Sequence, residues 1–208
     1  MPDFTTLAAF VSTSVVLAFI PGPDNLFVLT QSAMKGWRTG MAVTLGLCTG
    51  LIVHTTAVAA GVAVIFQQSE MAFTILKLVG AAYLLYLAYG ALRAGPAALA
   101  AGDAGPARLG PLYLRGIFMN VTNPKVAIFF LAFFPQFVTA GAGPVGIQVA
   151  ILGGLFILSA LIVFGFIAVA AGALSRWLLG TPRAQVMLNR GAGLLFIGLA
   201  AKLALSQR

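Results

Sequence analysis

Two proline-containing segments place charged side chains inside long apolar stretches of this chain. The first segment, residues 21–25, reads PGPDN, and the second, residues 123–125, reads NPK. An Asp or a Lys at the centre of a membrane span costs roughly 2.5 to 3.5 kcal/mol on the lenient insertion scale, so its presence asks for a function or a partner. Asp24 and Lys125 are therefore candidate ligand-binding residues, and each is also a candidate partner of the other.

The side chains around these two segments suit the two ends of a zwitterionic amino acid. Lys125 is suited to the carboxylate, and Asp24 with the side-chain oxygen of Asn25 is suited to the ammonium. Asn120 and Asn123 add donors and acceptors nearby. Asp24 is also the one carboxylate expected inside a span, which makes it the candidate for proton coupling. Burial favours its neutral form and a neighbouring ammonium favours its charged form, so its protonation state stays open.

The prolines predict that the helices are broken at both segments. A proline inside a helix removes one backbone hydrogen bond and clashes with the carbonyl group one turn earlier. Pro21 and Pro23 flank Gly22, which predicts a short unwound segment, and Pro124 predicts a second break. Non-helical backbone at membrane depth occurs only where it is packed in protein or lines a wet cavity. The backbone carbonyl groups near Phe19 and Ile20 and the N–H groups after Asn25 are therefore expected to be available to a polar ligand.

A purely structural role for the same residues stays open as an alternative. Asp24 would then cap the half-helix that follows Pro23, and Lys125 would be its structural counter-ion. A buried ion pair is a costly way to make two kinks. Capping and ligand binding also do not exclude each other.

The composition is that of an integral membrane protein. The 208 residues are 61% hydrophobic and 8% charged, and the mean hydropathy is +1.04. Soluble domains carry about 25% charged residues. At about 20 apolar residues per crossing, the length predicts six spans in a single transmembrane domain over residues 1–208. The net charge of +8 comes from basic residues at the ends of apolar segments, which points to membrane topology and not to a nucleic-acid partner.

Six apolar segments are predicted to cross the bilayer as helices, and the first and fourth contain the breaks. They cover about residues 4–34, 41–66, 71–92, 112–138, 146–174 and 186–205. Residues 1–94 and 112–208 then form two halves of three spans, joined by a loop at 95–111 that is rich in Gly, Ala and Pro. Because three is odd, the halves enter the membrane from opposite sides. Pairing Pro23 with Pro124 predicts an inverted repeat with a binding site at the membrane midplane.

The distribution of basic residues predicts the orientation in the membrane. The loops near Lys35, at 95–111 and near Arg183 are basic, whereas the alternate loops are not. The positive-inside rule places the basic loops in the cytoplasm and therefore both termini outside. Lys202 and Arg208 argue weakly against this orientation, because they are basic residues near the external end.

The two motifs, in register with six spans, resemble the LysE/RhtB family of amino-acid exporters, also called LysE-type translocators. The resemblance covers the whole chain and includes the aromatic run from Phe129 to Phe137 and the GAAYL stretch at 80–84. It implies export of amino acids or close derivatives across the bacterial inner membrane, driven by the proton gradient. Members of this family differ in substrate. The spans contain no extra acidic residue to match a dibasic substrate, so a small or neutral amino acid is favoured.

Two further polar residues in the spans are weaker candidates. His54 lies on one helical stripe with Gly46 and Gly50 at a spacing of four. This pattern predicts close helix packing with His54 hydrogen-bonded across the contact, and a second proton-handling group is the alternative. Gln31 follows Asp24 by about two turns and is expected either to line the same cavity or to cap the end of the first span.

Three glycines in the last span are read as close-packing positions. Gly191, Gly193 and Gly198 are spaced to allow a close helix contact, either within the chain or between the subunits of a homodimer.

Several other protein classes are disfavoured. A membrane aspartyl protease needs two intramembrane aspartates and a serine protease needs a paired base, so an enzyme is not expected. One histidine and the single Cys48 form neither a metal site nor a redox pair, and no cofactor is expected. A channel or a structural membrane component without coupled transport stays the alternative to a secondary transporter.

Overall fold

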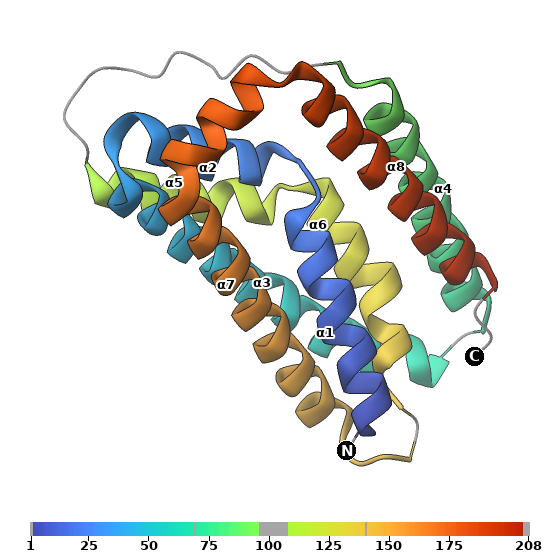
Figure 1. Cartoon of the computed structure of the whole chain (residues 1–208). Coiled ribbons are helices and arrows are strands. Elements are labelled where there is room, and N and C mark those ends of the chain that lie inside the picture. The colour runs from blue at the N-terminus through green and yellow to red at the C-terminus, as the bar shows by residue number, and fades with distance from the viewer. Residues whose placement is uncertain (1, 69, 96–107, 140, 206–208) are drawn as a thin grey trace.

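The computed structural model describes residues 2–68, 70–95, 108–139 and 141–205, in which all regular secondary structure is helical (Figure 1). The elements in order are α1 (Phe4–Phe19), α2 (Pro23–Lys35), α3 (Trp37–Gln68), α4 (Glu70–Arg93), α5 (Leu109–Val121), α6 (Pro124–Ile128), η1 (Phe129–Phe133), η2 (Phe134–Phe137), α7 (Val145–Gly180) and α8 (Pro182–Leu205). Within these ranges three helices are long and apolar enough to cross a membrane, or up to five if each of two bent pairs counts as one span. The all-helical class is confirmed, whereas the six-span inverted repeat stays a prediction.

Both proline motifs lie where one helix ends and the next begins. α1 and α2 meet at 60°, and α5 meets the α6 to η2 segment at 48°. Gly22 is the N-cap of α2 with Pro23 in the first turn, and Asn123 is the N-cap of α6 with Pro124 in the first turn. Proline is favoured at the start of a helix because the missing N–H would have no intrahelical partner there. The prolines therefore begin the second half-helices.

The interruption at the first motif is shorter than predicted. Residues 20–22 alone separate α1 from α2, and Asp24 and Asn25 lie in the first turn of α2. The N–H group of Leu26 donates to the carbonyl oxygen of Gly22 at 3.0 Å, so the first N–H group after Asn25 is already used inside the helix. The capping prediction for Asp24 is also wrong, because Gly22 occupies the cap position.

The segment after the second motif departs from a regular α-helix. α6 ends at Ile128, and the chain continues as one π-helical turn (η1) and one 3-10 turn (η2). Pro135 lies in η2, and its missing N–H and its ring prevent a regular helix through the preceding turn. The N–H group of Phe134 donates to Phe129 O, which is the five-residue spacing of a π-helix. The sequence predicted an unbroken continuation here.

The predicted loop at 95–111 lies mostly outside the described residues. Its last three residues, 109–111, are instead the beginning of α5. Pro111 is compatible with this because the first turn of a helix tolerates proline.

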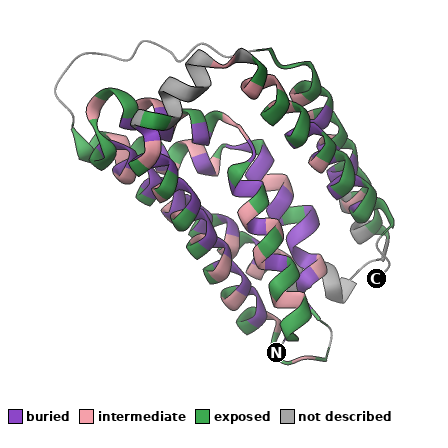
Figure 2. Ribbon diagram, viewed as in Figure 1, coloured by how far each residue is buried: buried purple, intermediate pink, exposed green. Residues whose placement is uncertain are grey.

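The helices pack as a main group and a lateral pair. α3 packs against α5 and α7, α7 also packs against α1 and α2, and α4 packs along α8. Figure 1 shows α4 and α8 side by side at one edge of the molecule, and Figure 2 shows that buried residues face the interior of the main group. α1 begins and α8 ends at one end of the molecule, whereas α4 ends and α8 begins at the opposite end.

The close packing expected at Gly46 and Gly50 is present between α3 and α5. A Cβ atom on Gly46 would overlap the backbone carbonyl oxygen of Tyr113, and one on Gly50 would lie 2.7 Å from the Cβ of Asn120. In α8, a Cβ on Gly193 would lie 2.6 Å from Leu92 Cγ. Gly193 is thus an internal packing position. By contrast, positions 191 and 198 have no heavy atom within 4 Å of an added Cβ, so the structure places no described part of the chain against them.

Gly46→Ala is expected to destabilise the protein, because backbone atoms of α5 cannot move away from the added methyl group independently. Overpacking of this kind costs about 1–3 kcal/mol. The check is the midpoint of thermal unfolding in detergent, with Gly61→Ala as the control. A Cβ on Gly61 meets nothing within 4 Å, so this variant should unfold like the wild type. Equal midpoints for Gly46→Ala and the control would contradict the packing.

Candidate functional site

The two charged residues of the motifs line one small buried cavity. This inner cavity has a volume of about 20 Å³, and Asp24, Asn120 and Lys125 supply its polar lining. Such a space holds about one water molecule. Its apolar lining comes from α1, α3, α6 and α7 and consists of Leu17, Ala18, Leu51, Val126, Phe156, Ala160 and Phe164. Two motifs about 100 residues apart in the sequence therefore meet in one place.

Asp24 is held by an amide group from the other motif. Its side chain is 2% exposed, and its Oδ2 accepts a hydrogen bond from Asn123 Nδ2 at 2.9 Å. Lys125 and Asn120 line the same cavity as this carboxyl group. Its second oxygen, Oδ1, is buried and has no hydrogen-bond partner in the described part of the chain. The carboxyl group is thus fixed on one side and has an acceptor available on the other.

Side chains of both motifs use the carbonyl groups that the first break releases. Lys125 Nζ donates to the carbonyl oxygen of Ile20 at 3.3 Å, and Asn25 Nδ2 donates to that of Ala18 at 2.6 Å. The carbonyl group of Ile20, which was expected to be available to a ligand, is therefore occupied in this conformation by the candidate binding residue Lys125. Asn123 adds a second link, because its Oδ1 caps α6 by accepting from the N–H group of Lys125 at 3.0 Å.

Three buried oxygens around this site lack hydrogen-bond partners. Asp24 Oδ1, Asn25 Oδ1 and Asn120 Oδ1 are acceptors with no partner among the described residues. Buried polar atoms are nearly always paired, so an unpaired one calls for a bound group or a water molecule. All three side chains are more than nine-tenths buried, at 2%, 7% and 1% exposure. An ammonium group carries three N–H donors and is a chemical match for such a set.

His54 contacts the end of α5, just before the second motif, but does not line the inner cavity. Its Nε2 lies 3.1 Å from the carbonyl oxygen of Asn120, and its ring lies 5.4 Å from that of Phe130. This is the hydrogen bond across the α3–α5 contact that the glycine stripe predicted. Gln31 is not among the residues that line either cavity described here, and its Oε1 is buried without a partner in the described chain.

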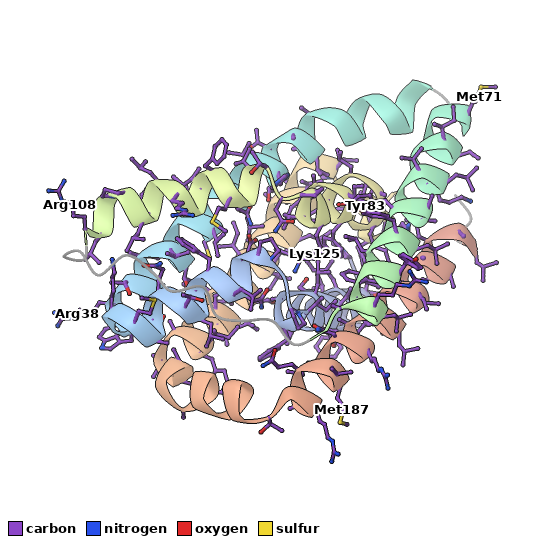
Figure 3. The ribbon with its side chains drawn as sticks, turned by 90° about the horizontal axis from the view of Figure 1, so that it is seen from above. Arg38, Met71, Tyr83, Arg108, Lys125 and Met187 are labelled. Atoms are coloured by element: carbon purple, nitrogen blue, oxygen red, sulfur yellow. The ribbon has the colours of Figure 1, made fainter. Side chains whose placement is uncertain are left out.

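A larger outer cavity of about 580 Å³ lies on the other side of Lys125. It is bounded by both motifs and by the lateral pair α4 and α8. Its lining consists of Pro21, Gly22, Pro23, Leu26, Tyr83, Tyr86, Leu87, Gly90, Ala91, Ala94, Gly95, Asn123, Pro124, Lys125, Asn189, Ala192 and Phe196. Figure 3 shows Lys125 and Tyr83 toward the middle of the molecule, with Arg38 and Arg108 on its rim.

Lys125 separates the two cavities, because it lines both of them. A Cβ on Gly22 would lie 3.2 Å from Lys125 Nζ, so the missing side chain at this position leaves room for the ammonium group. The sequence identified Gly22 and Lys125 but not Tyr83 or Asn189. Asn189 carries no motif, and Tyr83 lies in the GAAYL stretch, which entered the family resemblance but was not assigned to the site. Both residues join the site because α4 and α8 pack beside it.

A group of phenylalanines forms the apolar support of the site. Phe129, Phe130, Phe133 and Phe134 are almost completely buried, and they contact one another or Phe10 and Phe156 with ring centroids 5.0 to 6.5 Å apart. Among the described residues, no group of three or more His, Cys, Asp or Glu side chains is placed to hold a metal ion.

Comparison with known proteins agrees with the sequence motifs. Residues 15–207 match the family model described as LysE type translocator. Two proteins, from Salmonella typhimurium and Salmonella typhi, are each 37% identical over 196 residues, which cover 94% of this chain and 94% of each relative; both are named homoserine/homoserine lactone efflux protein. An uncharacterised membrane protein of Pseudomonas aeruginosa is 32% identical over 207 residues, covering 97% of this chain and 94% of its own. No solved structure matches the chain.

Proposed function

The chain belongs to the LysE type translocator family, and on this premise we propose that it is a secondary active exporter of amino acids or close derivatives from the bacterial cytoplasm. The observation that carries the proposal is the inner cavity, where a buried carboxylate and a buried ammonium from two helix breaks meet beside unpaired acceptors. Ionisable residues within membrane spans typically mark substrate or ion pathways.

The inner cavity has room for about one water molecule, so it would have to widen to admit a substrate. Its polar groups match those of a zwitterion. The ammonium group of the zwitterion would bind the unpaired oxygens of Asp24, Asn25 and Asn120, and its carboxylate would bind Lys125 in place of the carbonyl oxygen of Ile20. Two relatives carry the name homoserine/homoserine lactone efflux protein, which supports a small substrate without a second positive charge. We therefore place homoserine and similar neutral amino acids first among the substrates.

Proton coupling follows if the substrate ammonium and a proton compete for Asp24. The charged carboxylate binds the ammonium group, whereas the protonated carboxyl group loses most of that attraction and releases it. A proton from the outside would bind Asp24 and release the substrate there. The same proton would then leave Asp24 on the cytoplasmic side. His54, through Asn120 O, supports the second break and is not required to carry the proton.

The arrangement of helices supports an inverted repeat. α3 packs on α7 and α4 packs on α8, and these elements have equivalent positions in the two predicted halves. Each half also begins with a bent helix pair. In this proposal the outer cavity opens to the cytoplasm, because it is lined by the end of α4 and the beginning of α8, which the basic loops assign to that side. Both termini would then lie outside the bacterial inner membrane.

A homodimer is a further part of the proposal. The open positions Gly191 and Gly198 on α8 would allow a close contact between two copies. Disulfide cross-linking of Gly198→Cys in membranes tests this contact, and a chain that stays monomeric under oxidation would exclude it.

Efflux measurements test the proposed function directly. Cells loaded with individual labelled amino acids should lose homoserine faster when they express the chain, and purified chain in proteoliposomes should show saturable efflux that depends on the proton gradient. A channel would give flux that neither saturates nor responds to the gradient. No increase in efflux for any amino acid would refute the proposal.

Gly22→Ala is expected to weaken substrate binding while leaving the fold intact. The φ angle of Gly22 is −166°, so any residue can adopt this backbone, but the added Cβ would lie 3.2 Å from Lys125 Nζ and displace it. We expect the KM for efflux to rise by about three- to tenfold, equivalent to roughly 0.7 to 1.4 kcal/mol. Gly61→Ala serves as the control, and equal KM values for the two variants would contradict the contact.

A further inference from the structure

The outer cavity differs in charge from the inner cavity. Among the described residues that line it, Lys125 alone is charged, whereas Asp24 lines the inner cavity only. A ligand in the outer cavity therefore meets an ammonium group and no carboxylate. Such an environment favours a ligand with one negative charge and without an ammonium group of its own.

Apart from Asn123 and Asn189, the rest of the outer cavity is lined by apolar, aromatic or small residues. Leu26, Leu87 and Phe196 supply apolar surface, and the rings of Tyr83 and Tyr86 lie 5.7 Å apart along α4. Space is left between these groups because several neighbouring lining residues are small, namely Gly90, Ala91, Ala94 and Ala192. Walls of this kind bind the apolar part of a ligand, while a few polar groups orient its head.

The volume of about 580 Å³ exceeds what a small free amino acid needs. It lies within the range of about 300–1,000 Å³ that is usual for pockets holding drug-sized ligands, which are larger than homoserine. The additional volume lies against the apolar walls, so a ligand that fills it carries an apolar chain.

We propose that the outer cavity is a binding site for amphipathic monoanions of the N-acyl amino acid class. The carboxylate binds Lys125, the amide group lies beside Asn189, and an acyl chain of medium length follows Tyr83 and Phe196. Asn189 is held in place because its Nδ2 donates to the carbonyl oxygens of Ala94 and Gly95, each at 3.4 Å. Its Oδ1 is then an acceptor for the amide N–H of the ligand. This inference rests on the proposed function in one respect, because such a ligand is a close derivative of an amino acid.

Equilibrium binding of N-octanoylglycine to the full chain in nanodiscs tests this site. We expect N-octanoylglycine to bind at least tenfold more tightly than N-acetylglycine, which lacks the chain, and than N-octanoylglycinamide, which lacks the charge. Octanoate and lysophosphatidylglycerol represent a fatty acid and a lipid as other sources of an amphipathic anion, and both should bind at least tenfold more weakly. Tighter binding of either one, or no preference for the octanoyl chain, would overturn the proposal.

A pair of glycine variants localises the binding. Gly90 lines the outer cavity and Gly154 lies exposed on α7, and an added Cβ meets no atom within 4 Å at either position. We expect Gly90→Leu to weaken binding of N-octanoylglycine at least tenfold and Gly154→Leu to leave it unchanged. Equal binding by the two variants would overturn the site. Homoserine efflux is measured separately. Binding of N-octanoylglycine without efflux of any amino acid would refute the exporter and keep this site. Homoserine efflux without binding of N-octanoylglycine would refute this site and keep the exporter.

Discussion

Asp24→Asn is expected to abolish gradient-driven export while the protein still inserts in the membrane. The change preserves the size of the side chain but removes the one carboxylate that lines the inner cavity. Hydrogen bonds to charged groups contribute about 1.5–3 kcal/mol against roughly 0.5–1.5 kcal/mol for neutral pairs. Loss of this difference weakens ammonium binding by about tenfold, and loss of the titrating group removes coupling altogether. The measurement is the initial rate of homoserine efflux from loaded cells, normalised to the amount of protein in the membrane.

The matched control for this variant is Asp3→Asn. Asp3 is the N-cap of α1, where its Oδ1 accepts from the N–H group of Thr6 at 2.6 Å, and this bond holds the pKa of Asp3 below its usual value. Asn caps a helix about as well as Asp does, so export should not change. Wild-type efflux with wild-type pH dependence in Asp24→Asn would remove Asp24 from the mechanism and leave the structural role.

The positions of the two breaks were predictable from the sequence because the responsible chemistry is local. Proline acts on its own turn, and Asn123 caps the helix that follows it directly. The partnership of Asp24 with Lys125 was expected for a different reason, since each charge is too costly in a membrane without a partner. Both residues are buried and line one cavity, but their hydrogen bonds go elsewhere, from Asn123 to Asp24 and from Lys125 to the carbonyl oxygen of Ile20, so a direct pair stays a prediction.

Contacts between helices that are distant in the sequence could not be predicted, because they depend on how those helices cross. The contacts of Lys125 with Ile20 O and of Asn25 with Ala18 O require the orientation of α6 and α1 relative to α2. The expectation that the carbonyl group of Ile20 would be available to a ligand is wrong in this conformation for this reason. Tyr83 belongs to the outer cavity through the packing of α4, and the GAAYL stretch that contains it supported the family resemblance without indicating a place in the site.

Lys125→Met is expected to reduce export and to lower stability. Met has a similar length but no charge, so the substrate carboxylate loses its partner and Asp24 is left as a buried charge without a counter-ion. Removing one member of a buried pair typically costs about 3–5 kcal/mol. The midpoint of thermal unfolding in detergent should therefore fall well below that of Lys35→Met. Lys35 lies in the last turn of α2, where a positive charge contributes only about 0.3–1 kcal/mol.

The double variant Asp24→Asn with Lys125→Met separates stability from transport. With both charges removed, no uncompensated charge is buried, and replacing a buried ion pair by neutral groups is often neutral or stabilising. We therefore expect the unfolding midpoint to recover toward the wild-type value while homoserine efflux stays abolished. If the double variant instead lost as much stability as the two single variants together, the two charges would not interact. Recovery of efflux together with stability would show instead that the pair only supports the two broken helices, because a transporter that binds its substrate through these charges cannot work without them.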